Sequence, residues 1–188
     1  EQKALMQVRT LLNYPFLKRY YAGRFISNFG NGMSPVALAF GILHLKNGSP
    51  TLLGWILGSA TISMLIVAPF GGVIADKFGR VRMAGISDTW GSIGLFIQAF
   101  FFIKGDVPIW LMLIANINFG LMWGIFWPAN SGITPSLVPE ENLQQANAFA
   151  NFFTNSSVIM GAAIAGFLVS QFGAGWALLI DASTFLIS

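Results

Sequence analysis

The chain has 188 residues, of which 55% are hydrophobic and only 9% are charged, and its mean hydropathy is +0.68. About a quarter of the residues in soluble domains are charged, so this composition excludes an ordinary soluble domain and predicts a membrane protein. The net charge of +3 comes from residues spread between apolar runs rather than gathered in one patch, which argues against a nucleic-acid partner. With no Cys and one His, we predict no disulfide, no metal site and no cofactor.

Apolar runs divide the chain into membrane spans. Residues 1–21 mix basic and apolar side chains, lack the apolar core of a signal peptide, and predict an amphipathic segment on the cytoplasmic face. A helix needs about 20 residues to cross a bilayer. Runs of this size predict an all-α transmembrane bundle over residues 22–188, with spans at 22–45, 52–75, 83–103, 109–129, 148–172 and 174–188. The last span is incomplete and the chain begins at Glu1 rather than Met, so we expect a fragment of a longer protein.

The first span carries polar residues at helical spacing, among them Asn28 and Asn31. Lipid offers such side chains no partner, so we expect them to face the bundle or a water-filled cavity. They either line a transport pathway or form hydrogen bonds between helices, and the sequence leaves both open. In the second span, Gly54 and Gly58 have the spacing that allows close helix packing.

A charged turn separates the second and third spans and contains Gly72, Asp76, Lys77, Gly79, Arg80 and Arg82. Glycine at 79 can adopt the positive φ of a tight turn, and the three cations suit an anionic cytoplasmic leaflet. Asp76 can pair with these cations, so we interpret the six residues as a conformational latch that opens when the helices move. The alternative is a solvated loop whose surface ion pairs contribute about 0–1 kcal/mol each.

Two acidic residues lie inside the spans. An ionisable group in a span is costly enough to need a partner. Asp88 lies in the third span at the depth of Arg24 in the first, which predicts a structural ion pair; a proton site at Asp88 is the alternative. Asp181 lies midway along the sixth run, and the sequence names no partner for it.

The fourth and fifth spans add polar, aromatic and small residues. Asn116 and Trp123 of the fourth span join Asn28 and Asn31 as candidate cavity-lining residues. The Trp residues there either anchor the helix at the membrane interface or offer a stacking surface to an aromatic substrate. Three small residues of the fifth span predict a strip for helix packing, and they are Gly161, Ala165 and Gly166.

The distribution of Lys and Arg predicts the orientation. With the N-terminus inside, the cytoplasmic side holds Lys3, Arg9, Lys18, Arg19, Arg24, Lys77, Arg80 and Arg82, and the outer side holds Lys46 and Lys104. Cytoplasmic loops carry the excess of basic residues, so we predict a cytoplasmic N-terminus.

Three stretches resemble the major facilitator superfamily. The charged turn at 72–82 is similar to that family's loop between helices 2 and 3. Residues 23–31, which read GRFISNFGN, are similar to the first helix of a bacterial exporter branch that includes macrolide efflux proteins and siderophore exporters. Pro128-Ala129, the PSLVP run at 135–139, Leu143 and the ANA run at 146–148 are similar to that branch's connection between helices 4 and 5.

The resemblance implies two six-helix halves around a central cavity, with alternating access by rocking. This chain would be the N-terminal half, and its partners would be the missing C-terminal half of the same chain, the lipid bilayer and a small-molecule substrate. We expect a bacterial cytoplasmic (inner) membrane protein that exports a lipophilic or amphiphilic drug, macrolide or siderophore, by antiport.

Three departures from the family pattern concern proton coupling. Asn31 stands where many relatives carry an acid, Asn116 where proton-coupled relatives carry Arg, and Gly161-Ala162 where antiporters carry Gly-Pro. This half therefore does not support proton coupling by the family's usual residues. Asp88, Asp181 or the missing half would have to carry it.

Two rival interpretations remain. The chain could be a membrane scaffold or partner-binding subunit without transport, or a half-size transporter that works as a homodimer. An enzyme is not expected, because no set of nucleophile, base and metal ligands is present, and the lone His44 lies near the outer end of the first span.

Overall fold

Six α-helices make up almost all of the computed structural model, which describes residues 15–133 and 139–187. They are α2 (Pro15–Leu43), α3 (Pro50–Phe78), α4 (Arg80–Lys104), α5 (Ile109–Ser131), α7 (Leu143–Phe172) and α8 (Ala174–Ile187), with a short 3-10 turn, η1, at Glu140–Asn142. The all-helical bundle predicted from the sequence is confirmed. Most of the amphipathic segment expected at 1–21 lies outside the described residues, and from Pro15 onward the chain is already part of α2 rather than a separate element.

Local signals set several helix ends. Ser49 caps α3, because its hydroxyl accepts a hydrogen bond from the Leu52 amide at 3.1 Å, and Pro50 follows in the first turn. Gly79 separates α3 from α4 with φ of 93°, a conformation that a side chain would strain. Helix α3 therefore continues past the predicted end at Ala75 and stops only at Phe78.

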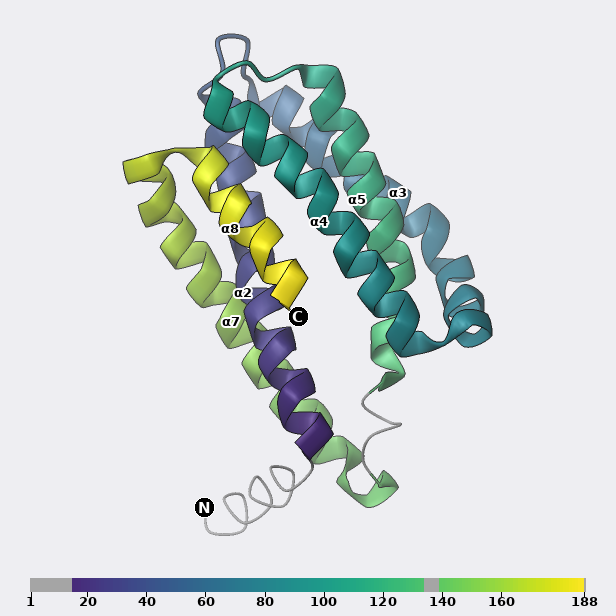
Figure 1. Cartoon of the computed structure of the whole chain (residues 1–188). Coiled ribbons are helices and arrows are strands. Elements are labelled where there is room, and N and C mark those ends of the chain that lie inside the picture. The colour runs from purple at the N-terminus through teal and green to yellow at the C-terminus, as the bar shows by residue number, and fades with distance from the viewer. Residues whose placement is uncertain (1–14, 134–138, 188) are drawn as a thin grey trace.

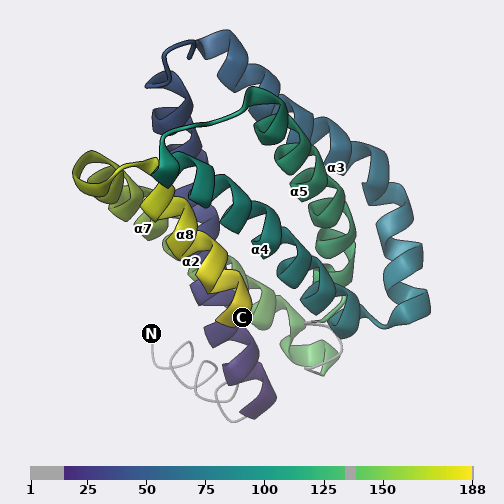
Figure 2. The ribbon, with the colours of Figure 1, turned by 45° about the horizontal axis from the view of Figure 1, so that its top comes forward.

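The helices form a bundle in which α2 packs against α7 and α8, α3 against α5, and α4 against α5 and α8 (Figures 1 and 2). The main core is built around α2, α4 and α8, and its fully buried side chains include Met33, Ile42 and Leu178. Helix α8 thus lies between the first and third spans, with its end near the middle of the bundle in Figure 1.

Four helices are long and apolar enough to cross a membrane: α3, α4, α5 and the helical segment Glu140–Phe172. Helix α2 is absent from this group, although it is 29 residues long, because its polar stripe lowers its hydropathy. Large apolar side chains such as Trp55, Leu65 and Phe167 are more than 60% exposed in the bundle. In a bilayer these surfaces face lipid, so the chain is a multi-pass membrane protein.

Close helix crossings depend on glycines that sequence spacing did not single out. A Cβ on Gly120 would overlap the Ala60 carbonyl of α3, and a Cβ on Gly32 would overlap the Val158 carbonyl of α7. Gly161 makes the expected kind of contact, against the Phe29 carbonyl of α2, and Ala165 is fully buried.

The structure differs from the sequence prediction at the other three glycines of the packing set. Beyond the glycine's own stretch of helix backbone, no described heavy atom lies within 4 Å of a Cβ built on Gly54, Gly58 or Gly166. These glycines lie on helix faces that turn away from the bundle, so spacing alone did not identify the contact face.

Candidate functional site

The charged turn holds one ion pair. Arg80 Nη2 and Nε lie 2.8 and 2.9 Å from Asp76 Oδ1, across the α3–α4 junction. The two side chains are 40% and 61% exposed, so water screens the pair and its contribution to stability is about 0–1 kcal/mol.

Arg80 also connects this turn to the end of α5. Its Nη1 donates a hydrogen bond to the Pro128 carbonyl at 3.4 Å. The guanidinium passes so close to Gly132 that a Cβ there would overlap it. One side chain thus links the junction of α3 and α4 to a third helix.

The other residues of the predicted latch occupy different places. Gly72 faces α5, with Pro128 Cβ 3.8 Å from where its own Cβ would be. Lys77 lies over the Phe78 ring at 5.6 Å, and Arg82 is exposed. The structure therefore brings together Asp76, Gly79 and Arg80 and directs Gly72 towards the same helix, but it does not bring Lys77 or Arg82 to the ion pair.

A second ion pair joins α2 to α4. Arg24 Nη1 lies 3.1 Å from Asp88 Oδ2, and both side chains are 12% exposed. The guanidinium also lies 4.5 Å from the centre of the Phe126 ring and donates to Asn28 Oδ1 at 3.4 Å. Three kinds of contact therefore fix this arginine, as expected for a charge brought into a membrane span.

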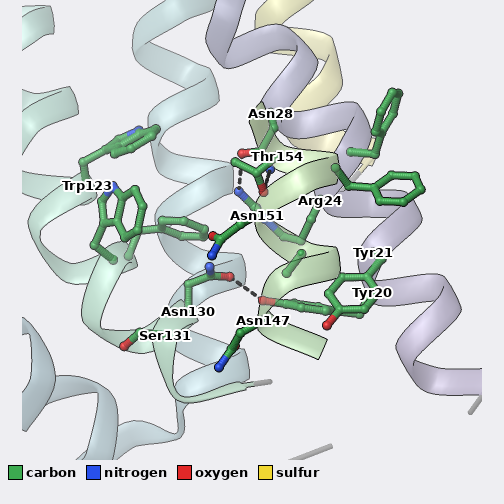
Figure 3. A pocket seen from close by; sticks show the side chains of 15 residues that line it. Tyr20, Tyr21, Arg24, Asn28, Trp123, Asn130, Ser131, Asn147, Asn151 and Thr154 are labelled. Carbon is green, nitrogen blue, oxygen red and sulfur yellow. Dashed lines mark hydrogen bonds between the residues drawn. The ribbon is translucent and has the colours of Figure 1, made fainter. Parts of the chain in front are cut away.

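A pocket of about 250 Å³ opens beside Arg24, where the start of α2, the end of α5 and the start of α7 meet (Figure 3). Its lining combines aromatic rings with amide side chains. Those labelled in Figure 3 include Tyr20, Tyr21, Asn28, Trp123, Asn130, Asn147, Asn151 and Thr154. Two predicted cavity residues, Asn28 and Trp123, are among them.

Hydrogen bonds across the pocket join helices that are distant in sequence. Tyr20 donates its hydroxyl proton to Asn130 Oδ1 at 2.6 Å, and Asn28 donates to Thr154 Oγ1 at 3.1 Å. Sequence reasoning missed Asn130, Asn147 and Asn151. Their recurrence in otherwise apolar helices is the signal that could have identified them.

A second pocket of about 220 Å³ lies between α2, α3 and α5 and is more apolar. Asn31, Ser34, Asn116 and Trp123 contribute to its lining, and Trp123 borders both pockets. The Asn116 amide nitrogen is already hydrogen-bonded within the bundle, because it donates to the Met112 carbonyl at 2.9 Å and to Gln98 Oε1 at 3.3 Å. All four predicted cavity residues thus border one of the two pockets.

The lining offers hydrogen-bonding groups and aromatic rings to a ligand. Amides and hydroxyls supply donors and acceptors. The Trp123 ring lies 6.0 Å from the Phe126 ring and 6.0 Å from the Trp127 ring, so three aromatic rings cluster in the pocket wall. Within residues 15–133 and 139–187, no group of three or more His, Cys, Asp or Glu side chains could hold a metal ion.

Comparison with known proteins identifies the same family along most of the chain. The family model described as Major Facilitator Superfamily matches residues 20–188. An uncharacterized MFS-type transporter, YfiS of Bacillus subtilis, is 24% identical over 94% of this chain and 41% of its own length. The enterobactin exporter EntS of Shigella boydii is 28% identical over 94% of this chain and 42% of its own length. The riboflavin transporter RibZ of Clostridioides difficile is 29% identical over 67% of this chain and 27% of its own length. The chain spans less than half the length of these relatives.

Proposed function

Because this chain belongs to the Major Facilitator Superfamily, we propose that it is the N-terminal half of a secondary active transporter that exports a lipophilic or amphiphilic small molecule. The observation that carries the proposal is the amide-rich aromatic pocket at the end of the bundle where Arg80 links the α3–α4 junction to α5. A binding pocket beside a breakable contact between helices is what alternating access requires.

The composition of the pocket supports an amphiphilic substrate. Trp123 and Trp127 offer ring faces for an apolar or aromatic part, while Asn147 and Asn151 offer donors and acceptors for a polar part. The names of two relatives, an enterobactin exporter and a riboflavin transporter, agree with cargo of this mixed character. The drug, macrolide and siderophore classes all remain within this description.

The proposed latch is the Asp76–Arg80 pair together with the hydrogen bond from Arg80 to the Pro128 carbonyl of α5. A transporter alternates between states separated by a few kcal/mol, so a contact of about 1 kcal/mol can bias the balance without locking it. Rocking of α3 and α4 relative to α5 would separate Arg80 from the Pro128 carbonyl. The remaining latch residues, Gly72, Lys77, Gly79 and Arg82, then act through the shape and charge of the turn.

The proposed setting is a bacterial cytoplasmic membrane with the N-terminus on the cytoplasmic side. The excess of Lys and Arg on one side supports this orientation. In this orientation the pocket and the latch lie at the cytoplasmic end of the bundle, because both involve the end of α5. The C-terminal half of the same protein would complete the cavity.

The test is accumulation of a panel of lipophilic drugs, macrolides and siderophores in efflux-deficient bacteria. Cells express the complete native polypeptide, the Asp76→Ala variant, or Asp106→Ala, which removes an exposed carboxylate from the opposite end of the bundle. We expect the native protein and Asp106→Ala to lower the accumulation of at least one compound, and Asp76→Ala to lose that effect at matched membrane expression. Normal export by Asp76→Ala would refute the latch, and equal accumulation of every compound with and without the protein would contradict export.

A further inference from the structure

Asp181, in the middle of α8, is a fully buried carboxyl group with no ion pair to any described residue. The Ser34 hydroxyl of α2 donates a hydrogen bond to its Oδ2. Its Oδ1 has no hydrogen-bond partner within the described part of the chain. The proposed latch and the Arg24–Asp88 pair make no use of this group.

The fold makes a specific space for this carboxyl group. Gly30 of α2 faces it, and a Cβ at that position would overlap both Asp181 Oδ1 and Thr184 Oγ1. The Thr184 hydroxyl donates to the Asp181 backbone carbonyl at 2.7 Å. A glycine on one helix and two hydroxyls therefore surround an acid in an otherwise apolar core.

Among residues 15–133 and 139–187, no positive charge forms an ion pair with Asp181. Helix α8 packs against α2, α4 and α7 and contacts α5 through Phe185 and Phe119, and neither α5 nor α7 contains an ionisable residue. On α2 and α4, Arg24 and Asp88 pair with each other, and Arg80 pairs with Asp76. The other described ionisable residues on or next to these two helices lie towards their ends: Lys18, Arg19, Tyr20, Tyr21, His44, Arg82 and Lys104. An ionised carboxylate would therefore be uncompensated in a medium where an isolated charge costs many kcal/mol, so the packed bundle favours the neutral acid.

Ser34 connects this buried acid to the space between the helices. It is 7% exposed and contributes to the lining of the pocket between α2, α3 and α5, next to Asn31 one turn away. Its hydroxyl thus has the pocket on one side and Asp181 on the other. A hydroxyl can accept one proton while it passes on its own.

We propose that Asp181 is a proton-binding site that is loaded from the pocket through Ser34 and that couples proton occupancy to the movement of α8 against α2. The inference rests on the proposed export function for its role in transport. A proton from the pocket binds Ser34 Oγ while the Ser34 hydroxyl proton passes to Asp181 Oδ2, so that the carboxylate becomes a carboxylic acid and its charge of −1 is neutralised. Release runs in the opposite direction.

Coupling follows from the difference in burial. The neutral acid is compatible with the closed packing of α8 on α2, whereas the carboxylate favours an arrangement in which these helices separate and admit water. Proton occupancy thereby shifts the balance between two arrangements of the bundle, which is the property an antiporter needs. Asn31 and Asn116 have no part in this step.

The first test reads the proton directly and needs no substrate. Infrared difference spectra of the purified, complete native polypeptide are recorded during a pH titration. We expect a carbonyl stretching band of a protonated carboxyl group that is lost in Asp181→Asn, shifted in Asp181→Glu and shifted in Ser34→Ala. Ser157→Ala is the matched control, because Ser157 is also fully buried and donates between helices, to the Phe25 carbonyl, but has no acid beside it.

The second test measures coupling. Proteoliposomes that contain the complete polypeptide are loaded with riboflavin, and its movement is followed with and without an imposed pH gradient. We expect the gradient to accelerate transport by the native protein and by Ser157→Ala, and this acceleration to be lost in Asp181→Asn while exchange without a gradient persists. The exchange activity and the infrared spectrum show that the variant is folded.

Together, the infrared test and the transport test distinguish failure of the proton-site inference from failure of the export proposal. A titrating band that persists unchanged in Asp181→Asn, or gradient-driven transport that persists in that variant, would overturn the proton site. If the band is lost as expected but riboflavin does not move in any variant, the proton site stands and the export proposal fails for this substrate.

Discussion

Arg24 Nη1 lies 3.1 Å from Asp88 Oδ2, and this ion pair joins α2 to α4 beside the aromatic pocket, which Arg24 helps to line. Both side chains are almost fully removed from solvent, and the Phe126 ring covers the guanidinium. A charge pair in this setting holds two spans in register and at the same time presents Arg24 to the pocket. It therefore links the packing of the bundle to the composition of the candidate pocket.

Removal of one partner of this pair should destabilise the protein. In Asp88→Ala, Arg24 keeps its charge in a mostly buried position without a counter-ion, which costs about 3–5 kcal/mol in comparable cases. Thermal unfolding of the detergent-purified protein measures this loss. Asp76→Ala is the control, since its pair is exposed and should contribute at most about 1 kcal/mol.

The same pair offers a test of the alternative in which Asp88 binds a proton. Asp88→Asn keeps the shape and a hydrogen-bond acceptor for Arg24 but cannot titrate. If Asp88 is structural, this variant should retain gradient-driven transport with some loss of thermal stability. A variant of normal stability that has lost only the response to a pH gradient would favour the proton site at Asp88.

Substitution at Gly132 should act on the latch from the side of α5. A Cβ at this position would overlap the Arg80 guanidinium, so Gly132→Ala should displace Arg80 from the Pro128 carbonyl and mimic Arg80→Ala in export assays. Gly85→Ala is the matched control, because Gly85 lies on α4 outside the latch and a Cβ there would meet nothing within 4 Å beyond its own stretch of helix. Equal export by Gly132→Ala and the native protein would argue against the Arg80 contact as part of the latch.

Helix crossings give a prediction about stability alone. Gly120→Ala and Gly161→Ala should each destabilise the protein by about 1–3 kcal/mol, since their new methyl groups would overlap backbone carbonyls that cannot move without the whole helix. Gly54→Ala should be neutral or slightly stabilising, because the site is open and Ala favours the helix. Unfolding temperatures of the three variants decide this. A Gly54→Ala variant less stable than Gly161→Ala would show that the contact faces are assigned incorrectly.

These sites also show how far the sequence alone could go. Depth in the membrane was enough to pair Arg24 with Asp88, because an ionisable group inside a span needs a partner and few are available. The turn at Gly79 followed from a local backbone requirement. In both cases the physical requirement, a counter-ion for a charge inside a span or a glycine at a positive φ, could be read from the residue types alone.

The rotation and tilt of each helix decide which glycines pack, which residue contacts Asp181 and which asparagines line the pocket. Sequence spacing does not determine this rotation and tilt. Gly54 and Gly58 have the same spacing as true packing glycines but face away from the described bundle. Asp181 had no nameable partner in the sequence, yet Ser34 of the first span contacts it. Asn130, Asn147 and Asn151 converge on one pocket only after α5 and α7 are placed next to α2.

Trp123 provides the sharpest test of the pocket, because it borders both cavities and packs against Phe119, Phe126 and Trp127. Loss of one aromatic contact to a ligand is worth about 0.5–1.5 kcal/mol, so Trp123→Ala should raise the Kd of an aromatic substrate about 2- to 12-fold. Trp123→Phe should retain most of the affinity, because it keeps a ring at the site.

Trp110→Ala removes a tryptophan that is 63% exposed at the start of α5, far along the helix from the pocket, and should leave Kd unchanged. Quenching of substrate fluorescence on the purified protein measures all three values. An equal effect of Trp110→Ala and Trp123→Ala would assign the tryptophans a general role in membrane anchoring rather than substrate stacking.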